Sequence, residues 1–118
     1  MRRIRAMKFS IVTPSYNQGR YIGDCIESVK AQTGAEWEHI VQDSESTDET
    51  AQVLARHPHL LAVREKDAGM SDGINRGFRR ATGDWVMWLN TDDYLLPGAL
   101  AEVAAFAARH PEADVVYG

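Results

Sequence analysis

Residues 85–93 have the sequence WVMWLNTDD, an apolar run with strand character that stops at two adjacent carboxylates, Asp92 and Asp93. In an open α/β sheet, ligands bind just beyond the carboxyl ends of the strands. Two acidic groups placed there repel each other unless a cation lies between them, and a divalent cation that also holds phosphate oxygens is the usual candidate. The ordinary alternative is that one aspartate caps the next helix, but a pair beside Asn90 favours a site. The stretch therefore predicts a metal-assisted site for a phosphorylated ligand.

The composition is that of one globular domain. The chain has 118 residues, of which 44% are hydrophobic and 25% are charged, as in an average folded protein. The formal net charge of -4 argues against nonspecific binding of nucleic acid, which needs a basic surface. The single cysteine, Cys25, excludes an internal disulfide and a cysteine-based zinc site. A lone cysteine also fits a reducing compartment, so we expect a cytoplasmic protein.

The two ends of the chain lead to further expectations. No apolar run approaches the ~20 residues of a membrane span, and no apolar signal core follows the basic start. We interpret residues 1–7 as a flexible extension, which leaves a peripheral membrane contact open, and residues 8–118 as the domain. The domain ends in a predicted strand with no element to cover it. We therefore expect the N-terminal part of a longer protein, or an edge that a second copy or a partner chain covers.

Strand-like and helix-like patterns alternate along the chain. Predicted strands cover residues 8–13, 37–41, 60–63, 85–89 and 114–117. Predicted helices cover residues 22–29, 46–56 and 71–83 and a stretch that begins at Pro97, with Ser46 and Ser71 as N-terminal caps. This order predicts an α/β fold with a Rossmann-like, mainly parallel sheet and helices on both faces. We place Trp85, Trp88 and Phe106 in its core, with the alternative that Trp88 borders a ligand pocket.

Every polar cluster of the chain follows a predicted strand. The clusters are residues 13–17, Asp43 with the residues after it, residues 66–71, and residues 90–93. Because the carboxyl ends of parallel strands meet at one edge of the sheet, all four clusters are expected at the same edge. The periodicity of the elements did not require this coincidence. It is the strongest argument from the residues themselves for a single site.

Several residues in these clusters are candidates for binding a nucleotide, each with an ordinary structural alternative. Thr13 and Tyr16 suit a nucleoside, with the Tyr16 ring packed on the base, or else they are a strand end and a surface loop. Asp43 suits hydrogen bonds to a base or a sugar, or else it is a turn residue. Asp72 is a site residue or a plain helix position. Lys66 and Arg76 are suited to offset the negative charge of a diphosphate, or else they are solvated surface residues, as long cationic side chains usually are.

Three common nucleotide or hydrolase motifs do not occur in the sequence. The chain has no Gly-x-Gly-x-x-Gly after its first strand, no P-loop and no Gly-x-Ser-x-Gly elbow. A receiver-type signalling domain has a similar length and layout, but it needs its acidic pair after the first strand. Here Thr13-Pro14-Ser15 stands at that point, so this interpretation is far behind the others.

Four segments together resemble the family 2 glycosyltransferases, enzymes of GT-A fold that use nucleotide-diphosphate sugars. The segments are SIVTPSYN at 10–17, DSESTDET at 43–50, GMSDGINRG at 69–77, and ATGD at 81–84 with WLNTDD at 88–93. The likeness runs from about residue 8 to the end. No single segment is decisive, but four in the right order are specific.

The resemblance implies roles for particular residues. Thr13, Pro14 and Tyr16 would line the nucleoside pocket, and Asp43 would contact the base, most often uracil. Asp92 and Asp93 would hold the ribose and the Mg2+ or Mn2+ on the diphosphate. The implied reaction is transfer of a sugar, from a UDP-sugar first of all, to an acceptor hydroxyl with inversion at the anomeric carbon. The metal would stabilise the departing diphosphate, and a carboxylate base would deprotonate the acceptor.

Two departures from the family pattern qualify these expectations. The family usually has glycines where this chain has Ser44, Glu45 and Glu49, which restricts the loop and adds negative charge. The family's catalytic base and acceptor region normally follow the part represented here, so no catalytic base is assigned. Two functions stay open: a glycosyltransferase or its N-terminal domain, and a nucleotide-sugar-binding module that does not transfer sugar on its own.

Overall fold

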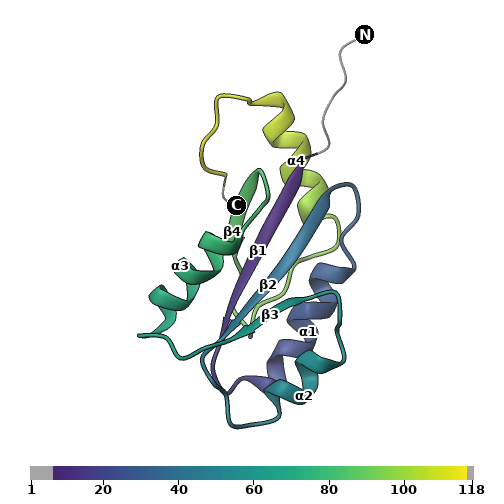
Figure 1. Cartoon of the computed structure of the whole chain (residues 1–118). Coiled ribbons are helices and arrows are strands. Elements are labelled where there is room, and N and C mark those ends of the chain that lie inside the picture. Colours follow the sequence, from purple (N-terminus) through teal and green to yellow (C-terminus); the bar gives the residue numbers. More distant parts are fainter. Residues whose placement is uncertain (1–6, 117–118) are drawn as a thin grey trace.

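Strands and helices alternate through residues 7–116, the part of the chain that the computed structural model describes (Figure 1). The strands are β1 (Lys8–Ser15), β2 (Glu36–Asp43), β3 (Leu61–Arg64) and β4 (Trp85–Trp88). The helices are α1 (Gly19–Lys30), α2 (Thr50–Ala55), α3 (Met70–Arg80) and α4 (Ala99–Arg109).

The strands form one sheet in the order β3-β2-β1-β4, and all neighbouring pairs are parallel. The chain steps from β1 to β2 and β3 in one direction and then returns to β4 on the other side of β1. Right-handed crossovers place the helices of opposite steps on opposite faces of a sheet. Accordingly α1 and α2 lie on one face together with α4, and α3 lies on the other (Figure 1). The predicted α/β fold with helices on both faces is confirmed.

The central strand β1 is buried along almost its whole length because it has a strand on each side and helices above and below. Phe9 and Ile11 point to the face of α1 and α4, where they join Cys25 and Leu100 in the larger core cluster. A smaller cluster between α1 and α2 completes that layer; its buried members are Ile22, Ile26 and Val41. Because both faces of β1 are covered, even its polar residues Ser10 and Thr13 are fully buried.

On the other face, α3 lies very close to β1 because two of its buried positions are glycines, Gly73 and Gly77. A Cβ atom added at Gly77 would lie 2.3 Å from the Cγ1 atom of Val12, which is far inside contact distance. The close approach brings the first turn of α3 to the carboxyl edge of the sheet. The glycine is therefore required by packing rather than by helix propensity, which it lowers.

Several element ends differ from their predicted positions, and three of the differences have a clear physical reason. The strand β1 continues through Pro14 to Ser15, because β4 pairs with β1 only as far as Val12 and β1 then tolerates proline as an edge strand does. The helix α2 begins at Thr50 rather than at Ser46, whose hydroxyl and N–H both bind the Asp43 carboxylate instead. Ser71 is wrong as a cap, since α3 begins one residue earlier, after Gly69 with φ 122°.

Two aromatic residues predicted for the core are exposed. Trp85 packs against the larger core cluster, but Trp88 is 55% exposed and Phe106 is 39% exposed. The reason at Trp88 is that α3 packs over β1 and β2 and leaves that face of the edge strand β4 open. Although β4 is apolar in sequence, only one of its two faces is covered.

The predicted terminal segments fall partly outside the described residues. Residues 1–6 of the predicted extension lie outside, whereas Met7 packs against the core and its carbonyl accepts the Glu36 N–H. The predicted last strand is not formed at residues 114–116, and Tyr117 lies outside. Residues with a high propensity for strands form one only where another strand is available to pair with them. Within residues 7–116, none of the helices has both the length and the apolar character needed to cross a membrane.

At the edge opposite the carboxyl ends, Glu38 joins β1, β2 and the turn before β4. Its Oε2 atom accepts hydrogen bonds from the Ser10 hydroxyl at 2.5 Å and from the Thr82 N–H at 2.7 Å. Burial alone would raise the pKa of Glu38, but these hydrogen bonds and the charge of Lys8 outweigh it and hold the pKa below its usual value. The ionised carboxylate therefore stabilises the folded chain.

Replacement of Glu38 by glutamine is expected to lower the free energy of unfolding at pH 7 by about 1 kcal/mol. Because the folded pKa is depressed, this contribution is complete above the ordinary glutamate pKa of about 4.3 and disappears as the pH falls through the folded value. Urea unfolding at pH 7, 5, 4 and 3 should show the difference from the wild type shrinking below pH 5. The exposed Glu36→Gln is the matched control, and a difference that stays constant down to pH 3 would contradict the assignment.

Replacement of Gly77 by alanine is expected to lower the free energy of unfolding by about 1–3 kcal/mol, because the new methyl group meets Val12. Helix propensity alone predicts the opposite sign, a gain of about 1 kcal/mol. Urea unfolding of Gly77→Ala decides between them. Asn75→Ala, on the exposed side of α3, is the control and should stay within about 0.5 kcal/mol. A stabilised Gly77→Ala chain would show that the helix is free to move away.

Candidate functional site

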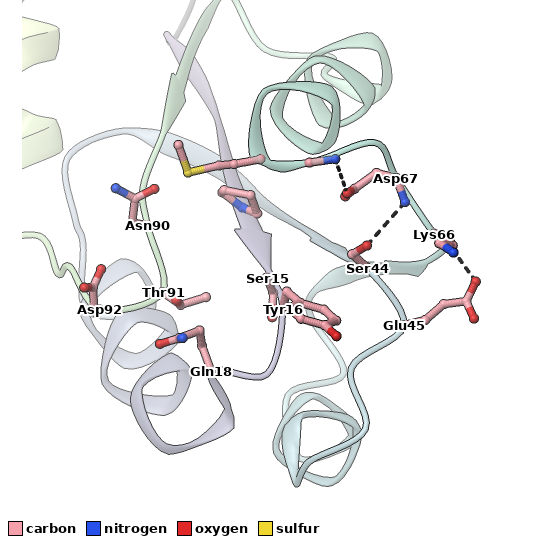
Figure 2. Close-up of a pocket in the computed structure, with 13 residues that line it drawn as sticks. Ser15, Tyr16, Gln18, Ser44, Glu45, Lys66, Asp67, Asn90, Thr91 and Asp92 are labelled. Carbon is pink, nitrogen blue, oxygen red and sulfur yellow. Dashed lines mark hydrogen bonds between the residues drawn. The ribbon is translucent and has the colours of Figure 1, made fainter.

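A cavity of about 780 Å³ opens at the carboxyl edge of the sheet (Figure 2). The segments that follow all four strands contribute to its wall. Pro14 and Ser15 at the end of β1 line the cavity together with Tyr16 and Gln18 from the loop that follows. After β2 the lining residues are Ser44 and Glu45, after β3 they are Lys66, Asp67, Gly69 and Met70, and after β4 they are Asn90, Thr91 and Asp92. The cavity lies where the strand order reverses between β1 and β4, which is the usual ligand position in open α/β sheets.

One side of the cavity is formed by side chains whose oxygen atoms could bind a cation. Figure 2 shows Asn90, Thr91 and Asp92 together on the side formed by the segment after β4. The Oδ1 atom of Asn90 is buried and has no hydrogen-bond partner among the described residues. Asp93 is exposed beside them, and its N–H donates to the Asn90 carbonyl at 3.1 Å.

Carboxylate and amide oxygens are the donors that Mg2+ and Mn2+ prefer, so this set of residues fits such an ion. Within residues 7–116 there is no group of three or more His, Cys, Asp or Glu side chains placed to hold a metal. A cation at Asp92 and Asp93 would therefore take most of its remaining ligands from a bound phosphate group and from water. Mg2+ in particular keeps several such ligands in nucleotide sites.

The opposite side of the cavity combines an aromatic ring with polar groups. The ring of Tyr16 is 59% exposed at the cavity, and Figure 2 shows it between the Asp92 side and the side of Ser44, Glu45 and Lys66. Aromatic side chains with an open face are the usual platforms for stacked bases. The cavity thus has one side suited to a base and another suited to a charged group.

The sequence-predicted residues divide between the cavity wall and the layer behind it. Pro14, Tyr16 and Asp92 line the cavity. Thr13 is fully buried, and its hydroxyl lies 2.7 Å from the Nε2 atom of His39. Asp43 is 3% exposed, and its two carboxylate oxygens accept the Ser46 hydroxyl and the Ser46 N–H. Both side chains therefore bind other parts of the protein in this structure.

Asp72 has a similar supporting position at the start of α3. Its Oδ2 atom accepts the Ala68 N–H at 2.9 Å and the Arg76 Nε–H at 2.9 Å. These two donors hold the pKa of Asp72 below its usual range. Arg76 also lies 3.4 Å from Glu65, so its charge is engaged by two carboxylates. Lys66, the other predicted cation, does line the cavity.

Two titratable groups behind the cavity, His39 and Cys25, are neutral near pH 7. Burial lowers the pKa of His39 to about 4, and burial raises the pKa of the Cys25 thiol to about 11, where the charges of Asp93 and Asp92 add to the shift. Neither group changes charge near pH 7. A protonated thiol is a poor nucleophile, so covalent catalysis by Cys25 is not indicated.

Sequence reasoning gave no individual role to several lining residues: Asp67, Met70 and Thr91, which lie inside the predicted clusters, and Gln18, which lies one residue beyond one of them. Each of them stands within a few residues of a strand end, which is the signal that found the others. Glu45 was recognised only as a departure from a family pattern, yet it lines the cavity.

Comparisons with known proteins identify the family of the chain. Residues 10–118 match the family model described as glycosyl transferase family 2. The PGL/p-HBAD biosynthesis glycosyltransferase of Mycobacterium tuberculosis is 39% identical over 119 residues, which cover 96% of this chain and 46% of that protein. The poly(ribitol-phosphate) beta-N-acetylglucosaminyltransferase TarS of Staphylococcus aureus is 31% identical over 111 residues, 88% of this chain and 19% of that protein. The chain thus spans less than half the length of these relatives.

Solved structures of glycosyltransferases share the fold. TarS residues 1–349 in complex with UDP-GlcNAc superpose with a TM-score of 0.79 at 30% identity, over 89% of this chain and 32% of that one. The mannosyltransferase PcManGT from Pyrobaculum calidifontis, in complex with GDP-Man and Mn2+, gives a TM-score of 0.78 at 26% identity, over 88% of this chain and 33% of that one. The expected GT-A fold is confirmed by these neighbours. The chain belongs to glycosyl transferase family 2.

Proposed function

We propose that the cavity binds a nucleotide-diphosphate sugar, with a UDP-sugar as the first candidate, as the donor for transfer to an acceptor hydroxyl with inversion at the anomeric carbon. The observation that carries the proposal is the position of the cavity, at the strand-order switch with an open aromatic ring on one side and oxygen ligands on the other. The complexes of the structural neighbours with UDP-GlcNAc and with GDP-Man support a donor of this class.

In this proposal the base stacks on Tyr16, and Pro14 forms the adjoining wall. Asp92 contacts the ribose or the metal at the other side of the cavity. Thr13, Asp43 and Asp72 contribute from behind the wall, because each already holds another part of the protein: His39, Ser46 and the Ala68 N–H respectively. Their role is to fix the segments that the nucleotide touches.

The charges of the lining residues favour a metal-dependent site. Glu45, Asp67 and Asp92 are carboxylates, and Lys66 is the basic side chain beside them in the lining. A diphosphate brought into this cavity would meet a negative wall unless a cation accompanied it. Asp92, Asp93 and the Asn90 oxygen would hold Mg2+ or Mn2+. When bound, the ion would offset the charge that develops on the departing diphosphate. The Mn2+ in the PcManGT complex supports this assignment.

Transfer also requires a base within hydrogen-bond reach of the acceptor hydroxyl. The cavity carboxylates are already assigned to donor binding or to the wall, so the alternative of a donor-binding module without transfer of its own is retained. An assay of sugar transfer against a panel of acceptors separates the two.

Location and association are parts of the same proposal. A cytoplasmic location is supported by the free thiol of Cys25. Association with a second copy or a partner chain is supported by the apolar residues Val86 and Trp88, which are exposed on the edge strand β4. A peripheral membrane contact rests on residues 2–5, which lie outside the described residues, and stays a prediction.

The metal assignment predicts that UDP binds at least about tenfold more tightly with Mn2+ than with EDTA, as measured by titration calorimetry, because the ion removes the repulsion between carboxylates and diphosphate. Asp92→Asn and Asp93→Asn should each reduce or abolish the difference. Asp24→Asn, on the exposed side of α1, should preserve it. Titrations with GDP and dTDP under the same conditions identify the base. Equal affinity with Mn2+ and with EDTA would overturn the metal assignment.

The supporting role of Asp43 predicts similar effects for Asp43→Ala and Ser46→Ala. Each should make the free energy of UDP binding less favourable by about 1 kcal/mol, because both substitutions loosen the same turn. Calorimetry on the two variants is the measurement, with circular dichroism as the check on folding. A direct contact between Asp43 and the base would instead make Asp43→Ala far more harmful than Ser46→Ala, and that result would contradict the supporting role.

A further inference from the structure

The loop after β3 is tied to the loop after β2 by two side chains. The Lys66 N–H donates to the Oε1 atom of Glu45 at 3.1 Å, and the Asp67 N–H donates to the Oγ atom of Ser44 at 3.3 Å. All four residues line the cavity (Figure 2). These two bonds join loops that are far apart in sequence. The loop after β2 provides the side-chain acceptors, and the loop after β3 provides the backbone N–H donors.

The remaining amides of the same loop are also satisfied. The Ala68 N–H donates to the Asp72 carboxylate at 2.9 Å, and the Gly69 N–H donates to the Asp67 Oδ1 atom at 3.0 Å. At its start, the Glu65 N–H donates to the Asp43 carbonyl at 2.9 Å. Five consecutive backbone N–H groups thus have partners in a segment that belongs to neither a helix nor a strand. Such a segment is held in one conformation before any ligand arrives.

Glu45 makes its tie from an unfavourable backbone conformation. Its φ angle is 54°, in the left-handed region that glycine adopts far more readily than other residues. Strained backbone of this kind persists where the surrounding structure holds it, and it concentrates at functional sites. A glycine at position 45 would relieve the strain but could not accept the Lys66 N–H, and a glycine at position 44 could not accept the Asp67 N–H.

We propose that Ser44 and Glu45 are positioning residues that clamp residues 65–69 and so pre-form the nucleoside side of the cavity. The inference rests on the proposed function, because it assigns these two residues to the binding of the nucleoside part of the donor. A wall that is ordered in advance does not have to lose conformational freedom when the nucleotide binds, and binding is correspondingly tighter. The departures from the family's usual glycines are then a feature of this site rather than a loss.

If Ser44 and Glu45 act as this clamp, a variant can lose affinity for UDP without losing stability toward urea. A contact that only stabilised the fold would not produce this combination. In Glu45→Gly the backbone strain is relieved, so the stability toward urea should be equal to or higher than that of the wild type. Loss of the Glu45 tie should nevertheless weaken UDP binding in the presence of Mn2+ by about tenfold. Glu45→Gln keeps a side-chain oxygen that can accept the Lys66 N–H, and it should bind UDP within about twofold of the wild type.

Amide hydrogen exchange without ligand tests the clamp itself. The Lys66 amide should exchange at least about tenfold faster in Glu45→Gly than in the wild type, and the Asp67 amide should do so in Ser44→Ala. Glu45→Gln should leave the Lys66 exchange rate near that of the wild type. Ser44→Ala serves as the second variant if Glu45→Gly does not fold.

The outcomes of these measurements are separable. Unchanged exchange at Lys66 and Asp67 would overturn the clamp, and so would a Glu45→Gly chain that binds UDP as tightly as the wild type. A wild-type chain that binds no nucleotide would overturn the proposed function and with it the assignment of the clamp to the donor. The exchange rates would still show whether the two loops are tied.

Discussion

The site depends on one constraint: beyond the first residue after a strand, backbone amides need hydrogen-bond partners that a neighbouring strand no longer supplies. The loop after β2 meets much of this need. Ser46 binds the Asp43 carboxylate with its hydroxyl and its N–H, and its Oγ atom also accepts the Asn17 N–H from the loop after β1. Ser44 and Glu45 accept amides from the loop after β3. One loop therefore links three of the four segments that surround the cavity.

The charge distribution follows from what lies behind this wall. His39 and Cys25 are buried and neutral near pH 7, and the Thr13 hydroxyl bonds to His39 between the neighbouring strands β1 and β2. Among the residues that line the cavity, carboxylates exceed basic groups. Such a surface repels a bare diphosphate and attracts a cation. Together with the family membership, this balance supports the proposal that a metal-accompanied nucleotide binds in the cavity.

Helix packing explains how the far end of the segment after β3 reaches the cavity. The glycine at position 77 lets α3 approach β1, and the first turn of α3 then brings Gly69 and Met70 to the cavity. The same arrangement leaves part of β4 uncovered, which is why Trp88 is exposed although its strand is apolar in sequence. The position of α3 thus shapes both the cavity and the open edge of the sheet.

The sequence by itself determined the fold class, the order of the elements and the edge at which the polar clusters meet, because periodicity and strand ends are local signals. It also indicated the family and placed Tyr16 and Asp92 at the edge where the cavity lies. Only the tertiary structure decided which polar side chains face the cavity. Thr13, Asp43 and Asp72 stand at strand ends or the start of a helix as predicted, but other protein groups bind their side-chain oxygens: His39 binds Thr13 across the sheet, and the nearby Ser46 and Ala68 bind Asp43 and Asp72. The start of α2 was misplaced for a similar reason, because the Ser46 side chain binds Asp43 instead of capping the helix. The choice that a polar side chain makes among several possible hydrogen bonds has no periodicity in sequence, so it becomes visible only once the chain has folded.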